Sequence, residues 1–228
     1  MKNKTTYHTY DHGHSVLGEI ICHFPYAVFS VAFSLIILSF TSWISLGSIQ
    51  VMQVKKGAHM LFHAFHFMHI VFAATGATLT FFRFSNNVVK GIIVSALTTT
   101  VFCTLSDSIL PYIGGKILGV NMHLHLCFLT ELQNVLPFLF IGLVNGYVLS
   151  RHHSLEQTRY SVSSHFVHIF ISSLASSFFL IANGLTDWYH SMGMVFLFLI
   201  IAVVVPCTLS DVVIPMSFAV TGKKSAKH

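Results

Sequence analysis

The sequence predicts an all-α polytopic membrane protein with six transmembrane helices, on the evidence of composition, apolar run length and an internal repeat. Of the 228 residues, 54% are hydrophobic and only 8% are charged, and the mean hydropathy is +0.74. A soluble domain carries about 25% charged residues. Six apolar runs reach roughly 20 residues, the length that crosses the hydrocarbon core of a bilayer. They occupy residues 14–40, 59–82, 88–110, 123–149, 162–183 and 191–215.

The first run is expected to remain as a helix rather than to be removed as a signal peptide. Its apolar stretch continues from about Val16 to Leu46 without a small-residue cleavage site. None of the runs alternates apolar and polar residues as the strands of outer-membrane barrels do. We therefore expect a multi-pass protein of the inner (cytoplasmic) membrane.

Basic residues predict that both termini lie in the cytoplasm. With six spans, one side holds the two termini and the loops at 83–90 and 150–161. That side carries nine basic residues against three on the other, and cytoplasmic loops are the ones enriched in Lys and Arg. The nine are Lys2, Lys4, Arg83, Lys90, Arg151, Arg159, Lys223, Lys224 and Lys227, and the three are Lys55, Lys56 and Lys116. The formal charge of +5 is thus assigned to the bilayer surface. Without a basic stripe and base-stacking aromatics, nucleic acid is not an expected partner.

Three short motifs recur in the same order in two halves of a single membrane domain that spans residues 1–228. The motifs are a glutamate six residues before a proline, the pattern HxxH, and Cys-Thr-Leu-Ser-Asp-x-x-x-Pro. They lie at Glu19 and Glu131, at His66–Ile70 and His165–Ile169, and at Cys103–Pro111 and Cys207–Pro215. The halves, 12–120 and 121–222, hold three spans each, so the second must enter the membrane from the opposite side. This predicts a 3+3 inverted-topology repeat, which is typical of secondary transporters.

Histidines cluster on helix faces in a way that favours metal binding. The chain has sixteen histidines. Four of them follow i, i+4, i+7, i+10 on the second span and cover a stripe of roughly 120°. Imidazole together with carboxylate suits first-row divalent cations. The candidate metal ligands are His59, His63, His66, His69, His123, His125, His165, His168 and the N-terminal His14. A lone histidine in a membrane helix is more often an interhelical hydrogen-bonding group.

Acidic residues within the spans are the second set of candidates, because a charged side chain at membrane depth is costly and usually functional. The candidate pathway residues are Glu19, Thr104, Asp107, Glu131, Thr208 and Asp211. The predicted orientation sets Asp107 toward the outer face and Asp211 toward the inner face. We therefore expect the two aspartates to be symmetric counterparts, one toward each end of a crossing path, rather than two ligands of one ion. The alternative for both is solvation at a helix end.

The four cysteines all lie within predicted helices and include no CxxC, so packing as small apolar side chains is the expected role. The function favoured by the sequence is transport or conduction of a divalent metal cation, with proton coupling as a further option. One alternative is a haem protein with bis-histidine ligation. Another is a metal-dependent membrane enzyme, but the ligands divide between both leaflets and no HExxH, nucleophile elbow or phosphate loop is present. A homo-oligomer is compatible with the short loops.

Overall fold

The computed structural model describes residues 16–45, 51–151, 156–185 and 188–225, and the regular secondary structure within these ranges is entirely helical. The long helices are α1 (Val16–Ser45), α2 (Val51–Phe84), α3 (Val88–Thr104), α6 (Leu132–Arg151), α7 (Glu156–Ala182) and α8 (Met192–Thr208). Shorter elements are α4 (Leu110–Ile117), α5 (Cys127–Thr130), α9 (Ile214–Ser225), the 3₁₀ turn η2 (Tyr189–Ser191) and the π-helical turns η1 (Leu105–Ile109) and η3 (Leu209–Val213).

Six spans in the described ranges are long and apolar enough to cross a membrane, which confirms the predicted number. They are Ile20–Phe40, Met52–Phe84, Val88–Ile117, Leu132–Arg151, His165–Ala182 and Tyr189–Thr221. Two of these are composite, because α3, η1 and α4 follow one another without a break, as do α8, η3 and α9. The composite spans run past the ends that the sequence predicted for them, residues 110 and 215.

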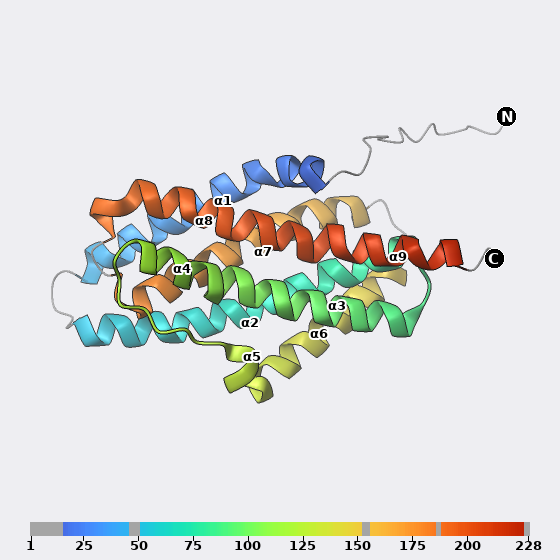
Figure 1. The fold of residues 1–228 in the computed structure, drawn as a ribbon, viewed down its shortest axis with the longest axis horizontal. Coiled ribbons are helices and arrows are strands. Elements are labelled where there is room, and N and C mark those ends of the chain that lie inside the picture. The colour runs from blue at the N-terminus through green and yellow to red at the C-terminus, as the bar shows by residue number, and fades with distance from the viewer. Residues whose placement is uncertain (1–15, 46–50, 152–155, 186–187, 226–228) are drawn as a thin grey trace.

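The long helices lie side by side along the long axis of the molecule (Figure 1). α2 is central, since it packs against α7, α6 and α3, while α1 covers α7 and α8. The start of α1 and the end of α9 lie at one end, together with the turn between α2 and α3 (Figure 1). We call this the terminus end, and we call the opposite end, where α2 begins and α7 finishes, the pocket end.

The fourth span is shorter than predicted, because residues 119–126 are not helical. Gly119 ends α4 with a positive φ of 78°, a conformation open to glycine at little cost. The backbone N–H of Val120 then donates to the Gly115 carbonyl, 2.9 Å away. The following segment crosses the end of α7, where the backbone N–H of His123 donates to the Asn183 side chain (3.0 Å). This brings the 123–125 region over α2 and α7 instead of into a helix of its own.

Each duplicated Asp-x-x-x-Pro sequence forms a π-helical turn at the aspartate. Proline has no N–H to donate to the carbonyl four residues earlier, and its ring crowds that carbonyl. The N–H before each proline instead bonds five residues back, from Leu110 to the Leu105 carbonyl and from Ile214 to the Leu209 carbonyl. The helices therefore continue through Pro111 and Pro215 with one wide turn. Such π bulges often occur at functional sites.

Candidate metal centre

Histidine, aspartate and cysteine side chains from both halves of the chain meet in one buried group, which we call the central cluster. Its members come from α2 and α3–η1 in the first half and from α7 and α8–η3 in the second. They are His66, His69, Cys103, Asp107, His165, His168, Cys207 and Asp211. All are buried except His165, whose side chain is 22% exposed.

In the first half, Asp107 is fully saturated with hydrogen bonds. Its Oδ2 accepts from Nδ1 of His66 at 2.8 Å and from Nδ1 of His69 at 2.7 Å. Its Oδ1 accepts from the hydroxyls of Ser106 and Ser172, both at 2.8 Å. Because an ionised carboxylate can only accept, these contacts assign the Nδ1 proton to both imidazoles. Asp107 therefore holds the His69 ring in one orientation, with its Nε2 directed toward His168.

The second half repeats the arrangement only in part. Asp211 Oδ2 lies 2.5 Å from Nδ1 of His168 and 3.6 Å from Nδ1 of His165. Its Oδ1, however, has no hydrogen-bond partner among the described residues, and neither has the neighbouring Ser210 hydroxyl. The internal repeat explains the gap, because the position equivalent to the donor Ser172 is Ala73. Alanine offers no hydroxyl, so one carboxylate oxygen stays buried and unpaired.

The two halves touch through their second histidines. Nε2 of His69 and Nε2 of His168 are 2.6 Å apart. Since Nδ1 of each ring donates to its own aspartate, two Nε2 lone pairs face each other, and they repel unless a proton or a metal ion lies between them. The result is a continuous polar chain from Asp107 through both imidazoles to Asp211, inside the helix bundle.

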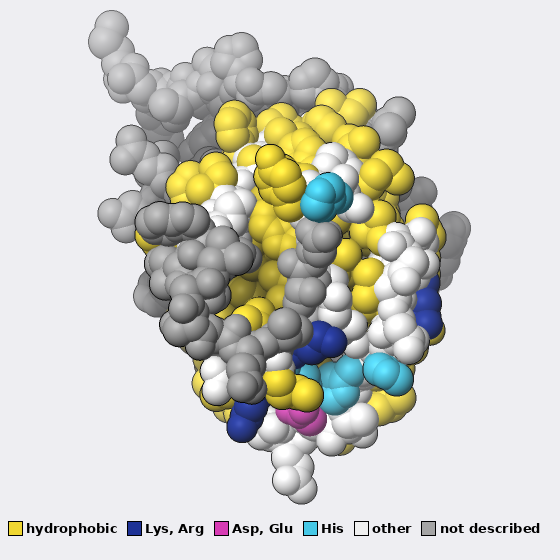
Figure 2. Space-filling view, turned by 90° about the vertical axis from the view of Figure 1, so that its left-hand side faces the viewer, with side chains coloured by type: hydrophobic (Ala, Val, Ile, Leu, Met, Phe, Trp, Pro, Cys, Tyr) yellow, Lys and Arg dark blue, Asp and Glu magenta, His cyan; other side chains and the backbone are white. Residues whose placement is uncertain are grey.

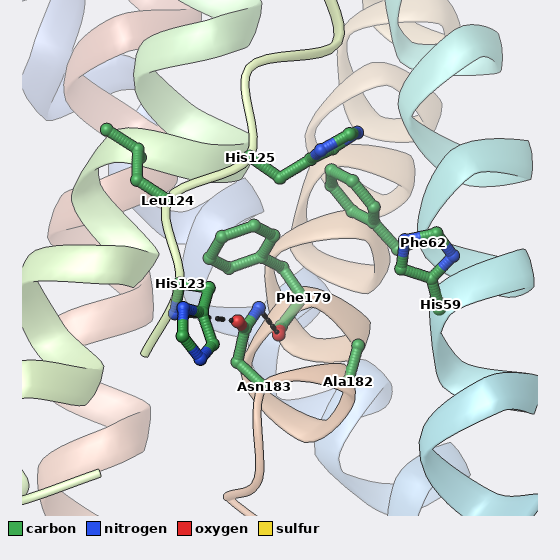
Figure 3. A pocket seen from close by; sticks show the side chains of 8 residues that line it. All are labelled: His59, Phe62, His123, Leu124, His125, Phe179, Ala182 and Asn183. Carbon is green, nitrogen blue, oxygen red and sulfur yellow. Dashed lines mark hydrogen bonds between the residues drawn. The ribbon is translucent and has the colours of Figure 1, made fainter. Parts of the chain in front are cut away.

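A pocket of about 240 Å³ opens at the pocket end. It is lined by His59, Phe62, His123, Leu124, His125, Phe179, Ala182 and Asn183. Figure 3 shows how its walls are built: α2 supplies one side, α7 supplies another, and the segment with His123, Leu124 and His125 supplies a third. Figure 2 views this end of the molecule and shows histidine side chains gathered beside acidic and basic ones.

Next to the pocket, the His63 ring contacts both the pocket histidines and the carboxylate of Glu131. Its Nε2 lies 3.0 Å from Glu131 and 3.3 Å from Nε2 of His125, and its Nδ1–H donates to the His59 carbonyl (2.8 Å). Burial opposes ionisation of Glu131, but the hydrogen bond from Asn134 and the neighbouring imidazoles outweigh it and lower the pKa of the carboxyl. Glu131 is therefore a carboxylate at neutral pH. Burial raises the pKa of the nearby Cys127 thiol to about 12.

The structure separates the candidate residues into three groups. The central cluster gathers Asp107, Asp211 and the HxxH histidines, and the pocket end gathers Glu131 with His59, His63, His123 and His125. The hydroxyls of Thr104 and Thr208 donate to carbonyls of their own helices, those of Thr100 and Val204 (both 2.7 Å). The Glu19 side chain and His14 lie outside the described residues.

One sequence expectation differs from the structure, and a second is extended by it. Asp107 and Asp211 do not lie toward opposite ends of a path, because the composite spans run on to Ile117 and Thr221 and so place both aspartates deep in the bundle. Cys103 and Cys207 are buried in the core without disulfides, as expected, and each Sγ also lies within 3.8 Å of Nε2 of His69. Their position carried a signal, because both stand one helical turn before the aspartate, on the same face.

The described residues include four groups of three side chains whose ligand atoms are close enough to hold a metal ion. Three of these groups belong to the central cluster, and the fourth consists of His63, His125 and Cys127. Comparison of the chain with protein-family models, with curated proteins and with solved structures found no significant match. Its own geometry indicates a multi-pass membrane protein with buried groups that are compatible with metal binding.

Proposed function

We propose that the protein moves a divalent transition-metal cation across the membrane, as a carrier or a channel, and that the central cluster binds the ion in transit. The observation that carries the proposal is the pair of facing Nε2 atoms of His69 and His168, each backed by a buried carboxylate at Nδ1. Histidines that bind metals generally donate their other N–H to a carboxylate in this way. A dication would also compensate the negative charges of Asp107 and Asp211, because burying these charges without compensation is costly in a low dielectric.

A ladder of histidines on α2 supplies the approach to this site. His59 is exposed at the pocket, the His63 side chain is 13% exposed, and His66 and His69 are buried. Successive members are one turn apart, so an ion can pass from one imidazole to the next. Beyond the cluster, His165 is partly exposed and its ring contacts that of His23 (centroids 5.1 Å apart). Binding groups thus extend from the pocket end through the buried centre toward the terminus end.

The repeat and the charge distribution support the rest of the proposal. We infer that the halves form a 3+3 inverted-topology repeat, with the ion at their interface as in secondary transporters. Equivalent HxxH and Asp residues make equivalent contacts and meet in the cluster. We also propose that the terminus end faces the cytoplasm, because Arg83, Lys90 and Arg151 lie at the helix ends on that side.

The geometry favours a bare ion over haem or an organic substrate. Two axial imidazoles on one haem iron would hold their Nε2 atoms about 4 Å apart, twice a metal–nitrogen bond of about 2 Å, with a flat macrocycle between them. Here the two Nε2 atoms are 2.6 Å apart, with thiols beside them. An enzyme is favoured less than a transporter, because the cluster is enclosed by helices and presents little surface on which an organic molecule could bind.

Flux measurements on purified protein in liposomes test the proposal. A metal-sensitive dye inside the vesicles reports entry of Zn²⁺, Co²⁺, Mn²⁺ or Ni²⁺. The test variants are His69→Asn and His168→Asn, since asparagine keeps a donor near the Nδ1 position and lacks Nε2. We expect wild-type flux that saturates with metal concentration and at least a tenfold loss in either variant. The matched control is His190→Ala, an exposed histidine of η2 outside the ladder, which should keep wild-type flux.

Two results would overturn the proposal. One is wild-type flux no faster than in protein-free liposomes for every cation of the series. The other is that both variants, His69→Asn and His168→Asn, transport the cations as fast as the wild type while their thermal unfolding is unchanged. If one of these variants unfolds at a lower temperature than the wild type, it is replaced by His66→Asn, which removes another histidine of the series on α2.

A further inference from the structure

The two cysteines that begin the duplicated motif approach the same imidazole nitrogen from two different helices. Cys103 Sγ on α3 lies 3.8 Å from Nε2 of His69, and Cys207 Sγ on α8 lies 3.7 Å from it. Both side chains are buried, and neither cysteine forms a disulfide. Ligand atoms of Cys207, His69 and His168 all lie within 4.8 Å of one another. Two imidazoles and one thiol therefore already surround one point in the bundle, and the thiol of Cys103, which is outside this group of three, lies beside it against His69.

The sulfur–nitrogen separations at His69 match the edges of a tetrahedral metal site, and Cys103 would have to move closer to His168 and Cys207 to complete it. Metal–nitrogen bonds of about 2.0–2.1 Å and metal–sulfur bonds of about 2.3 Å give sulfur–nitrogen edges of about 3.6 Å and a nitrogen–nitrogen edge of about 3.4 Å. The observed sulfur–nitrogen separations of 3.7 and 3.8 Å are within about 0.2 Å of that edge. The Nε2–Nε2 separation is 2.6 Å, so the imidazoles would have to move apart by about 0.8 Å to admit the ion.

We propose that His69, His168, Cys103 and Cys207 form a Cys₂His₂ site for a borderline-soft dication that accepts tetrahedral coordination, of which Zn²⁺ is the type. This inference rests on the proposed function and deepens it by naming the class of ion. Thiolate ligands select zinc-like ions, whereas Mg²⁺ and Mn²⁺ prefer oxygen ligands and six-coordinate geometry. Asp107 and Asp211 then act through the two histidines by fixing the orientation of each ring.

The internal repeat strengthens the assignment. Cys103 and Cys207 are equivalent positions of the repeated motif, as are His69 and His168, so the four proposed ligands form two pairs of repeat-equivalent residues. Cysteines that serve only to fill space need not converge on one nitrogen. Cys22 provides the contrast, because it is exposed on α1, whereas Cys127 belongs to the separate group with His63 and His125.

Cobalt spectroscopy tests the site without measuring transport. Co²⁺ is added to purified full-length protein in detergent, because tetrahedral cobalt with thiolate ligands shows sulfur-to-metal charge-transfer bands and intense visible d–d bands. We expect both sets of bands in the wild type, their loss on adding equimolar Zn²⁺, and their persistence in excess Mn²⁺ or Mg²⁺. The variant Cys103→Ser/Cys207→Ser should lose the charge-transfer bands and bind Zn²⁺ at least a hundredfold more weakly. The matched control, Cys22→Ser, should keep them.

The outcomes separate this inference from the proposed function. Zinc affinity in the double cysteine variant within threefold of wild type, or a wild-type cobalt spectrum without charge transfer, would overturn the inference. Zinc flux that survives the double substitution would likewise exclude the cysteines while leaving transport intact. Conversely, charge-transfer bands together with no flux would establish the Cys₂His₂ site and overturn transport, since the ion would then be resident. A thermal-unfolding scan of each serine variant verifies that it is folded.

Discussion

Asp107 and Asp211 should affect the affinity for a single ion as a coupled pair. Each accepts Nδ1–H from a histidine, and the Nε2 atoms of these two histidines are 2.6 Å apart. Asp107→Asn keeps the shape of the side chain but removes its charge and turns one acceptor position into a donor. Loss of a carboxylate behind a metal-binding histidine weakens affinity about 10–100-fold, which is about 1.4–2.8 kcal/mol. We expect a loss of the same order from Asp211→Asn.

A double-mutant cycle measures the coupling. Zinc affinity is determined by competition with a chelating dye for the wild type, both single variants and the double variant. Groups in one hydrogen-bonded network typically couple by about 0.5–3 kcal/mol, so the double variant should lose less than the sum of the single losses. Metal content per chain should be one ion. Two bound ions, of which each single variant abolishes one, would refute a shared centre, and so would unchanged affinity in both single variants.

Three further substitutions, the first with a matched control, probe the surroundings of the proposed ion. A Cβ on Gly76 would lie 2.8 Å from the Oδ2 atom of Asp211, so Gly76→Ala should lower the free energy of unfolding by about 1–3 kcal/mol in chemical denaturation. The control is Gly57→Ala, because a Cβ there meets no atom within 4 Å. It should leave the free energy of unfolding unchanged or raise it by up to about 1 kcal/mol. Glu131→Gln removes the carboxylate at the pocket end and should raise the half-saturating metal concentration for flux severalfold, with little change in maximal rate. Pro111→Ala restores an N–H that can bond the Asp107 carbonyl, so the π turn should close and cobalt binding should weaken at unchanged helix content by circular dichroism.

Much of the fold follows from composition and periodicity. A long apolar run in a nearly uncharged chain has few alternatives to a membrane helix, and six such runs are present in the structure. The spacing of His59, His63, His66 and His69 also predicted a common face of one helix. In the structure these four residues form a series that passes from the exposed pocket into the bundle. Helical periodicity is a local property, and for that reason it can be seen in sequence.

The depth of each residue was harder to predict, because it depends on where the spans end. Pro111 and Pro215 are residues that commonly end helices, but a π turn lets the helix continue past them. That continuation moves Asp107 and Asp211 from a predicted helix end into the centre. The helix break at Gly119 and the non-helical segment that follows it also could not be predicted from hydropathy. The convergence of Cys103 and Cys207 on His69 depends on the packing of several helices. The sequence shows only that each cysteine shares a helix face with the aspartate of its own motif.

The unpaired Oδ1 of Asp211 makes the two ends of the molecule unequal, although the sequence motifs are duplicated. Two identical halves would hold an ion equally well toward either face, and loading from either side would be equivalent. Asp107 has both oxygens saturated, whereas Asp211 keeps spare acceptor capacity on the side where His165 is partly exposed. If the proposed ion binds in the central cluster, we expect the ion or its accompanying water to be held preferentially toward the terminus end. Ala73→Ser should supply the missing donor, and inward and outward fluxes measured in oriented vesicles should then become more alike.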